Sequence, residues 1–266
     1  MEAGPPGAAV EVPARVRALA AGRPVRVVWQ NELGGLTCEV GPAAERLFVK
    51  WTPTGSPIDL DQERMRLAWA AAFTTVPAVL DHGRDADGAW LVTSALPGDS
   101  AVSERWTADP AAAIAALGAG LRAFHDALPV DACPFSWSVD DRLAEIRRRA
   151  ALGRTRPDRW HADHRHLDLQ GALAILERPP PIDRLVVCHG DTCAPNTIIA
   201  EDGQCSGHVD LGALGVADRW ADLAIATWST DWNYGPGWQP ALLSAYGIAP
   251  DDQRTRYYRL LYDLGP

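Results

Sequence analysis

Residues 186–196 read Val-Val-Cys-His-Gly-Asp-Thr-Cys-Ala-Pro-Asn, and residues 208–212 read His-Val-Asp-Leu-Gly. In the first segment an apolar run ends in a polar turn that holds Asp191, and Asn196 follows five positions later. The second segment is a short strand-like stretch that ends at Asp210, before a glycine. Phosphoryl transfer requires a carboxylate near the acceptor hydroxyl, with an Asn and an Asp that hold Mg²⁺ on the nucleotide phosphates. The two segments together therefore predict a phosphoryl-transfer site with Asp191 as the catalytic group.

The spacing of these residues matches a motif with a known mechanism. Protein kinases use an H-R-D-x-x-x-x-N loop and a D-F-G turn, and this chain has H-G-D-x-x-x-x-N and D-L-G. A D-x-x-x-x-N pattern alone also arises by chance in loops rich in Asx turns. The prediction therefore depends on the combination, and on a lysine and an acid in the right places upstream.

Lys50 and Glu63 occupy those upstream places. Lys50 ends an expected strand over 45–51, and Glu63 lies thirteen residues later on an expected helix over 60–73. In a kinase-like fold such a lysine contacts the α- and β-phosphates, and a helix glutamate fixes its position. The alternative is that both are ordinary solvated charges.

A glycine hairpin precedes the lysine strand. Strands are expected over 25–30 and 37–40, with Gly34 and Gly35 at the turn between them. The backbone N–H groups of such a turn can lie over phosphate oxygens. An ordinary hairpin would show the same two glycines, so this pattern does not decide between the two interpretations.

The 266 residues suit two lobes rather than one small core. Strands over 76–80 and 90–93, with a polar loop over 81–88, complete an expected N-terminal lobe of residues 1–94. Residues 95–266 form the second lobe, which the composition predicts to be mainly helical. Its expected helices are 111–128, 140–151, 168–177, 218–230, 237–246 and 250–263. This pattern predicts an α+β protein with two lobes.

Composition narrows the classes of partner. The formal net charge of −9 argues against nucleic acid as a partner and favours cationic ligands. No apolar run reaches the length of a membrane span, and the N-terminus does not resemble a signal peptide. We therefore expect a cytoplasmic protein that does not bind membranes, present as a monomer or weak dimer. Five cysteines without a C-x-x-C pattern indicate neither a disulfide framework nor a zinc site.

Aromatic and acidic side chains gather in the C-terminal third. Trp228, Asp231, Trp232, Tyr234 and Trp238 fall within eleven residues, part of them in an expected loop. Aromatic residues in helices usually belong to the core. Because this cluster includes an acid and loop residues, it also suggests a binding wall for a cationic ligand.

The chain resembles the aminoglycoside O-phosphotransferases, most closely the 3′ type, with the 3″-type streptomycin enzymes next. The likeness spans about residues 25–264. It is carried by the segments 47–50, 63–69, 133–135, 187–191, 195–196, 210–212, 215–224 and 257–261. The resemblance implies a protein-kinase-like fold with a five-stranded N-lobe, and ATP-dependent phosphorylation of an antibiotic hydroxyl that gives resistance.

The resemblance also implies roles for single residues. Asp191 matches the catalytic aspartate, and Asn196 and Asp210 match the Mg²⁺ ligands. Lys50 and Glu63 match the phosphate lysine and its partner. Ser94 and Leu96 match the linker positions whose backbone meets adenine, and Asp222 matches a buried aspartate that braces the catalytic loop. The acceptor candidates are Asp163, Asp168, Asp231, Trp232, Trp238 and Asp263.

Two departures concern the acceptor side. Many 3′ enzymes have an arginine after the D-L-G, where this chain has Ala213, and a second family arginine matches Trp228. The acceptor is therefore open: a 2-deoxystreptamine aminoglycoside, streptomycin, or another hydroxylated cationic metabolite.

Two further functions compete with a small-molecule kinase. A nucleotide-binding pseudoenzyme would not need Lys50, Glu63, Asp191, Asn196 and Asp210 all intact. A protein kinase would show an A-P-E segment after Asp210, and none follows.

Overall fold

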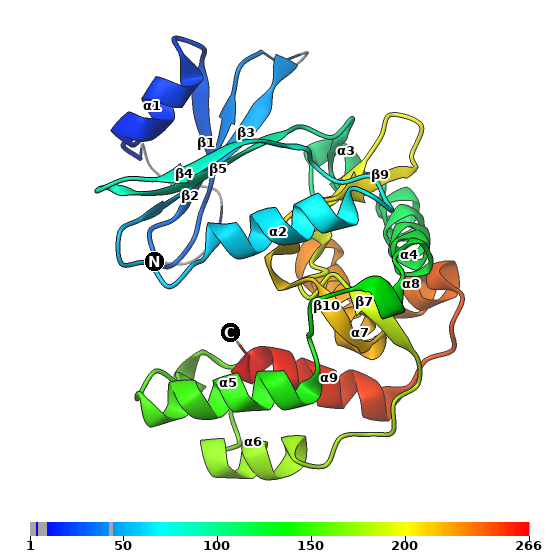
Figure 1. The fold of residues 1–266 in the computed structure, drawn as a ribbon. Helices are drawn as coiled ribbons and strands as arrows, with labels where there is room; N and C mark the ends of the chain where they lie inside the picture. The colour runs from blue at the N-terminus through cyan, green and yellow to red at the C-terminus, as the bar shows by residue number, and fades with distance from the viewer. Residues whose placement is uncertain (1–3, 5–9, 43–44, 266) are drawn as a thin grey trace. The chain divides into compact units, whose positions relative to one another are not determined.

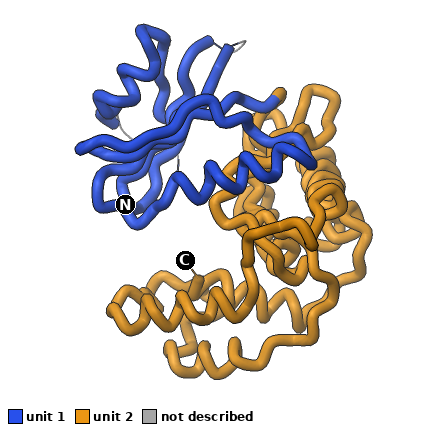
Figure 2. Tube along the Cα trace, viewed as in Figure 1, with its two compact units in different colours: residues 1–96 blue, residues 97–266 orange. Residues whose placement is uncertain are grey.

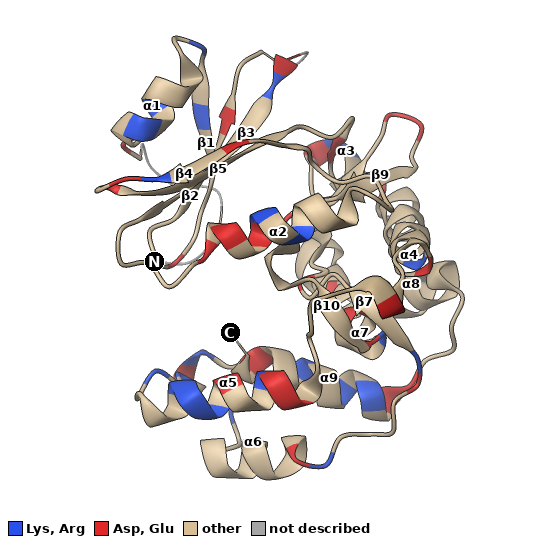
Figure 3. Ribbon diagram, in the orientation of Figure 1, with Lys and Arg blue, Asp and Glu red and all other residues tan. Residues whose placement is uncertain are grey.

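The structure is a computed structural model that describes residues 4, 10–42 and 45–265. The chain divides into two compact units, residues 1–96 and 97–266 (Figure 2). Acidic and basic residues are interspersed in both units (Figure 3). Among the described residues, each helix is too short or too polar to span a bilayer.

Unit 1 is built on a five-stranded antiparallel sheet of order β1-β2-β3-β5-β4 (Figure 1). Its elements are α1 (Ala14–Ala20), β1 (Val25–Gln30), β2 (Leu36–Val40), β3 (Leu47–Pro53), α2 (Leu60–Ala70), β4 (Val79–Arg84) and β5 (Gly88–Ser94). Successive strand residues point to opposite faces of a sheet. Val49 packs with Val16 of α1, so the neighbouring Lys50 lies on the other face, where α2 packs on β5 and β4.

Unit 2 is mainly helical. Its helices are α3 (Glu104–Thr107), α4 (Pro110–Ala127), α5 (Val139–Ala151), α6 (Leu169–Leu176), α7 (Trp220–Tyr234), α8 (Gln239–Tyr246) and α9 (Asp252–Leu264), with 3₁₀ turns η2 (Val130–Ala132), η3 (Pro157–Arg159), η4 (Ala194–Asn196) and η5 (Leu211–Ala213). Its strands are β6 (Asp99–Ser100), β7 (Leu185–Cys188), β8 (Thr197–Ile199), β9 (Cys205–His208) and β10 (Gly215–Asp218). Strand β7 pairs with β10, and β8 lies between β6 and β9.

Local sequence signals explain where several helices begin. The side chains of Asp109, Ser138 and Asp251 accept a hydrogen bond from a backbone N–H in the first turns of α4, α5 and α9. Such caps satisfy donors that have no partner within the helix. Gly118 then lets α4 approach α8, because a Cβ there would lie 2.6 Å from the carbonyl oxygen of Leu242.

The predicted class, an antiparallel sheet with a helix followed by a mainly helical region, is confirmed. The expected strand over 76–80 is wrong in its position, since β4 covers Val79–Arg84 and includes half of the expected polar loop. Because β4 is an edge strand with mostly solvent-facing side chains, its polar sequence does not identify it. Strands β6 and β10 were not predicted, and α7 extends to Tyr234, so Asp231 and Trp232 lie on a helix rather than in a loop.

Candidate active site

The loop that holds Asp191 starts where β7 ends. Val186, Val187 and Cys188 are buried and pair with β10, so the loop leaves a fixed strand. Inside the loop, His189 is fully buried; its Nδ1 accepts from the backbone N–H of Asp191 at 3.2 Å. Its Nε2 lies 2.9 Å from the carbonyl oxygen of Val209. His189 therefore joins the loop to the segment that carries Asp210.

Asp222, on α7, braces the same loop. Its carboxylate is fully buried and accepts from the backbone N–H groups of His189, at 2.6 Å, and Gly190, at 2.9 Å. Burial alone would raise the pKa of Asp222, but the hydrogen bond and charge of His125 lower it below its ordinary value. Gly190 has a φ of +87°, and a Cβ there would lie 2.5 Å from the carbonyl oxygen of Ala213. The loop conformation thus requires both this glycine and this aspartate.

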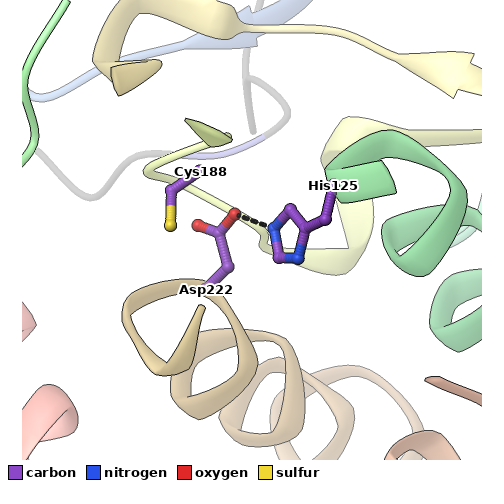
Figure 4. Close-up of side chains that lie close together, drawn as sticks. All are labelled: His125, Cys188 and Asp222. Carbon is purple, nitrogen blue, oxygen red and sulfur yellow. Dashed lines mark hydrogen bonds and ion pairs between the residues drawn. The ribbon is translucent and has the colours of Figure 1, made fainter. Parts of the chain in front are cut away.

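His125 and Cys188 complete a buried cluster with Asp222 (Figure 4). The Nε2 of His125 lies 2.9 Å from Asp222 Oδ2, and its Nδ1 lies 2.8 Å from the hydroxyl of Tyr246. The candidate ligand atoms of the three residues lie within 4.8 Å of one another. Both ring nitrogens and both carboxylate oxygens already have hydrogen-bond partners, so the cluster is a structural brace. Through this contact His125 orients Asp222.

Asp191 is surrounded by three donors. Its Oδ1 accepts from the hydroxyl of Tyr262 at 3.0 Å and from the thiol of Cys193 at 3.1 Å. Its Oδ2 accepts from Asn196 Nδ2 at 3.2 Å, and the same nitrogen donates to the Asp191 carbonyl oxygen at 2.9 Å. The carboxylate is therefore held on both sides, although Asp191 is only partly buried.

Asn196 and Asp210 lie on neighbouring segments. Thr197 pairs with His208 across β8 and β9, and the backbone N–H of Val209 donates to the carbonyl oxygen of Asn196 at 2.9 Å. Asp210 follows directly, exposed and in the left-handed conformation at φ 68° and ψ 51°. Because Asn196 uses its amide nitrogen toward Asp191, its amide oxygen keeps its lone pairs for another partner. An amide oxygen and a carboxylate are the hard donors that Mg²⁺ prefers, so this pair fits that ion.

Within unit 1, Lys50 and Glu63 form an ion pair. Lys50 Nζ lies 2.6 Å from Glu63 Oε1 and 2.8 Å from Oε2. Glu63 is 5% exposed, and the Lys50 side chain is 22% exposed. The sheet and α2 thus bring together the two residues that the sequence pairs across thirteen positions.

The other expected nucleotide residues lie in the hairpin turn and at the end of β5. Gly34 has a φ of +81°, and the backbone N–H of Gly35 donates to Asn31 Oδ1 at 2.8 Å. The backbone N–H of Leu33 donates to the same oxygen at 2.9 Å and closes an Asx turn. Ser94 exchanges hydrogen bonds with Ala78 through its backbone N–H and its hydroxyl, and Leu96 is buried.

Two of the expected acceptor residues, Asp231 and Trp232, lie in the last turn of α7. Trp232 is 47% exposed and lies with its ring centroid 5.1 Å from that of Trp228. Asp231 accepts from Gln239 Nε2 at 2.5 Å through Oδ2, whereas its Oδ1 is buried without a hydrogen-bond partner. Trp238, just before α8, is half-buried against the core.

The remaining acceptor candidates have contacts with their own neighbourhood. Asp263 Oδ2 accepts from the backbone N–H of His161 at 2.7 Å and lies 2.8 Å from His164 Nδ1. Asp168 caps α6 by accepting from the N–H of Gly171 at 2.7 Å. Asp163 is exposed and lies 3.4 Å from His161. Asp263 and Asp168 therefore stabilise the local chain in this structure.

Comparison with known proteins identifies the family. The model of the phosphotransferase enzyme family called APH matches residues 29–258. The chain belongs to this family. It is 37% identical over 219 residues to an aminoglycoside 3′-phosphotransferase of Streptomyces fradiae, covering 79% of this chain and 81% of the relative.

Solved structures agree with the APH assignment. A crystal structure of aminoglycoside-3′-phosphotransferase of type VIII superposes with a TM-score of 0.81 at 30% identity, covering 94% of this chain and 97% of the other. A structure of aminoglycoside phosphotransferase APH(3″)-Id from Streptomyces rimosus, with ADP and streptomycin, gives a TM-score of 0.74 at 28% identity and covers 94% and 95%. The expected resemblance and the expected enzyme class, a phosphotransferase, are both confirmed.

Sequence reasoning missed two groups that touch Asp191 in this APH protein. Tyr262 comes from α9, and no sequence motif singles out Cys193 among the five cysteines. Trp228, which the resemblance matches to a family arginine, is buried between His161 and Trp232, and Arg259 lies 5.3 Å from its ring centroid. No periodic pattern signals the contact between Tyr262 and Asp191, because these residues lie 71 positions apart.

Proposed function

We propose that this phosphotransferase is of the 3′ type: it transfers the γ-phosphoryl group of ATP to a hydroxyl of an aminoglycoside antibiotic and so confers resistance. The observation that carries the proposal is the Asp191 site, held by Asn196 and braced by Asp222 within a chain of the APH family. The name of the Streptomyces fradiae relative and the ADP and streptomycin of the Streptomyces rimosus structure support the substrate classes.

In this proposal Asp191 is the catalytic residue. Its carboxylate orients the acceptor hydroxyl and accepts the proton as the oxygen attacks phosphorus. Asn196 and Asp210 would hold Mg²⁺, which when bound would neutralise charge on the nucleotide phosphates. Lys50, fixed by Glu63, holds phosphate oxygens in unit 1, with the Gly34–Gly35 turn and the Ser94 and Leu96 backbone as further nucleotide contacts.

We propose that the last turn of α7, with Asp231 and Trp232, is the main surface that binds the acceptor. Trp232 offers an exposed indole face to an ammonium group, and the unpartnered Oδ1 of Asp231 offers a charge-assisted hydrogen bond after a small movement. The secondary candidates for contact with the acceptor are Trp238, Asp163, Asp168 and Asp263. Asp168 and Asp263 would first have to release their present partners.

A second candidate is the 3″ phosphorylation of streptomycin. The structural similarity to the Streptomyces rimosus protein favours it, as does Ala213 at the place of the arginine found in many 3′ enzymes. The position of the new phosphate distinguishes the two functions, since a 3′ product and a 3″ product carry it on different sugars.

The test is turnover against a panel. ADP release is measured with ATP and Mg²⁺ on several 2-deoxystreptamine aminoglycosides, on streptomycin and on a generic protein substrate, and phosphorus NMR locates the new ester. We expect Asp191→Asn to lower kcat on the accepted drug by about 10²–10⁴, the usual range for a general base. The matched control is Glu201→Gln, at an exposed turn between β8 and β9. Turnover of the protein substrate alone, or an Asp191→Asn variant within a few-fold of wild type, rejects the proposal.

A further inference from the structure

The two oxygens of Asp191 have different surroundings. Oδ1 receives two donors, the Tyr262 hydroxyl at 3.0 Å and the Cys193 thiol at 3.1 Å, and these two donors lie 3.6 Å apart. Among the residues that the structure describes, Oδ2 receives one donor, the amide of Asn196 at 3.2 Å. A carboxylate oxygen accepts about two hydrogen bonds in its plane, so Oδ1 is filled whereas Oδ2 keeps a free position.

The Tyr262 hydroxyl is held by a well-anchored helix. Asp251 caps the start of α9, and Leu260, Leu261 and Leu264 of this helix are buried. Helix α9 also packs against α7, which carries the brace residue Asp222. Tyr262 thus reaches Asp191 from a fixed element rather than from a mobile loop.

Tyr262 donates its proton and does not accept one from Asp191. Burial raises the pKa of Tyr262 well above its ordinary value, and the neighbouring Cys193 and Asp191 raise it further. Burial raises the pKa of Cys193 in the same way. Both groups therefore remain protonated at neutral pH, and each can donate to a charged Oδ1.

We propose that Tyr262 is a positioning residue, whose hydroxyl fixes Oδ1 of Asp191 and leaves Oδ2 as the oxygen that receives the acceptor hydroxyl. This inference rests on the proposed role of Asp191. Without the tyrosine donor, Oδ1 keeps only a thiol, which is a weak donor. The carboxylate can then rotate, and a misplaced base slows the chemical step more than it weakens binding of the drug.

The decisive variant is Tyr262→Phe, which removes one oxygen and keeps the ring. We expect kcat on the accepted aminoglycoside to fall about tenfold, since one charge-assisted hydrogen bond is lost. We expect the drug KM and the ATP KM to stay within about twofold. The matched control is Tyr257→Phe on the same helix, which also loses one hydrogen bond but does not touch Asp191. Its kcat should equal that of the wild type even where its thermal midpoint falls.

A double-mutant cycle with Asp191→Asn separates positioning from general damage. If Tyr262 acts through the Asp191 carboxylate, adding Tyr262→Phe to Asp191→Asn should change turnover by less than about twofold. The inference is overturned if Tyr262→Phe lowers kcat tenfold in both backgrounds, if it leaves kcat unchanged, or if Tyr257→Phe lowers kcat equally. Each of these results leaves the proposed function intact. If the Asp191→Asn variant is as active as the wild type, the proposed function is rejected, and the inference with it.

Discussion

His208 shows how a single buried residue near the loop depends on its protonation state. The Nδ1 atom of His208 lies 3.2 Å from the Thr197 hydroxyl oxygen, and its ring is edge-on to Phe124 with a centroid distance of 5.1 Å. Burial lowers the pKa of His208 from 6.5 to about 3, and the neighbouring His189 and His125 act in the same direction. A backbone hydrogen bond at Gly120 and the charge of Asp222 oppose this lowering of the pKa only in part, so His208 is neutral in the folded protein.

This depressed pKa predicts a loss of stability on acidification. Below pH 6.5 His208 is protonated in the unfolded chain, whereas in the folded chain it stays neutral down to about pH 3. Because the unfolded chain then binds more protons, the free energy of unfolding falls as the pH falls. Between pH 6.5 and 5 the loss should be about 2 kcal/mol. Urea unfolding across this range should give a flatter pH dependence for His208→Asn, whereas the exposed control His166→Asn should follow the wild type. Parallel curves for His208→Asn and the wild type would contradict a neutral, buried His208.

At the scale of elements, the sequence predicts those parts whose signals are local. Helix α5 begins beside Ser138 and ends at Ala151, within one residue of its expected range, because capping and apolar spacing act along the chain. Strand β4 is misplaced because an edge strand needs no apolar pattern. Strand β10 is missed because four residues carry too little pattern, and its pairing with β7 is a long-range contact.

The residues of the site also differ in whether a local sequence signal or a long-range contact places them. Lys50, Glu63, Asp191, Asn196 and Asp210 are found from their spacing, and the structure brings Lys50 to Glu63 and Asp191 to Asn196. The groups that orient them come from distant elements: His125 reaches Asp222 across 97 positions, and Tyr262 reaches Asp191 across 71. Tertiary packing alone creates such contacts, so neither periodicity nor spacing predicts them.

Asp222 attaches α7 to the loop that holds Asp191. Asp222→Ala leaves the N–H groups of His189 and Gly190 and the ring of His125 buried without their acceptor. Removing one partner of a buried charged pair costs about 3–5 kcal/mol of unfolding free energy. Urea unfolding should show this loss, whereas Thr230→Val, which removes a buried hydroxyl bonded within α7, should cost about 1 kcal/mol. A smaller loss in Asp222→Ala than in Thr230→Val would mean that the loop holds its shape without this brace.

At the scale of the whole molecule, the excess of negative charge matters for the choice of acceptor. The formal net charge is −9, and many cations are already paired, such as Arg147 with Glu177 and Arg148 with Glu145. An acidic surface attracts polycations and repels nucleotides over about 10 Å at 0.1 M salt. If the acceptor is a polycationic aminoglycoside, its binding should therefore weaken with salt, and binding of ATP should not.

The salt dependence of drug binding can be measured at the proposed acceptor surface. Between 50 and 500 mM NaCl we expect the drug KM to rise roughly tenfold, because added ions screen the contacts, while the ATP KM stays flat or falls. Asp231→Asn should raise the drug KM several-fold at low salt and make it less sensitive to salt, since one of the screened charges is gone. The exposed control Asp202→Asn, in the turn between β8 and β9, should change neither value. A drug KM that ignores salt, with Asp231→Asn silent, would place recognition elsewhere in unit 2 or point to an acceptor that is not a polycation.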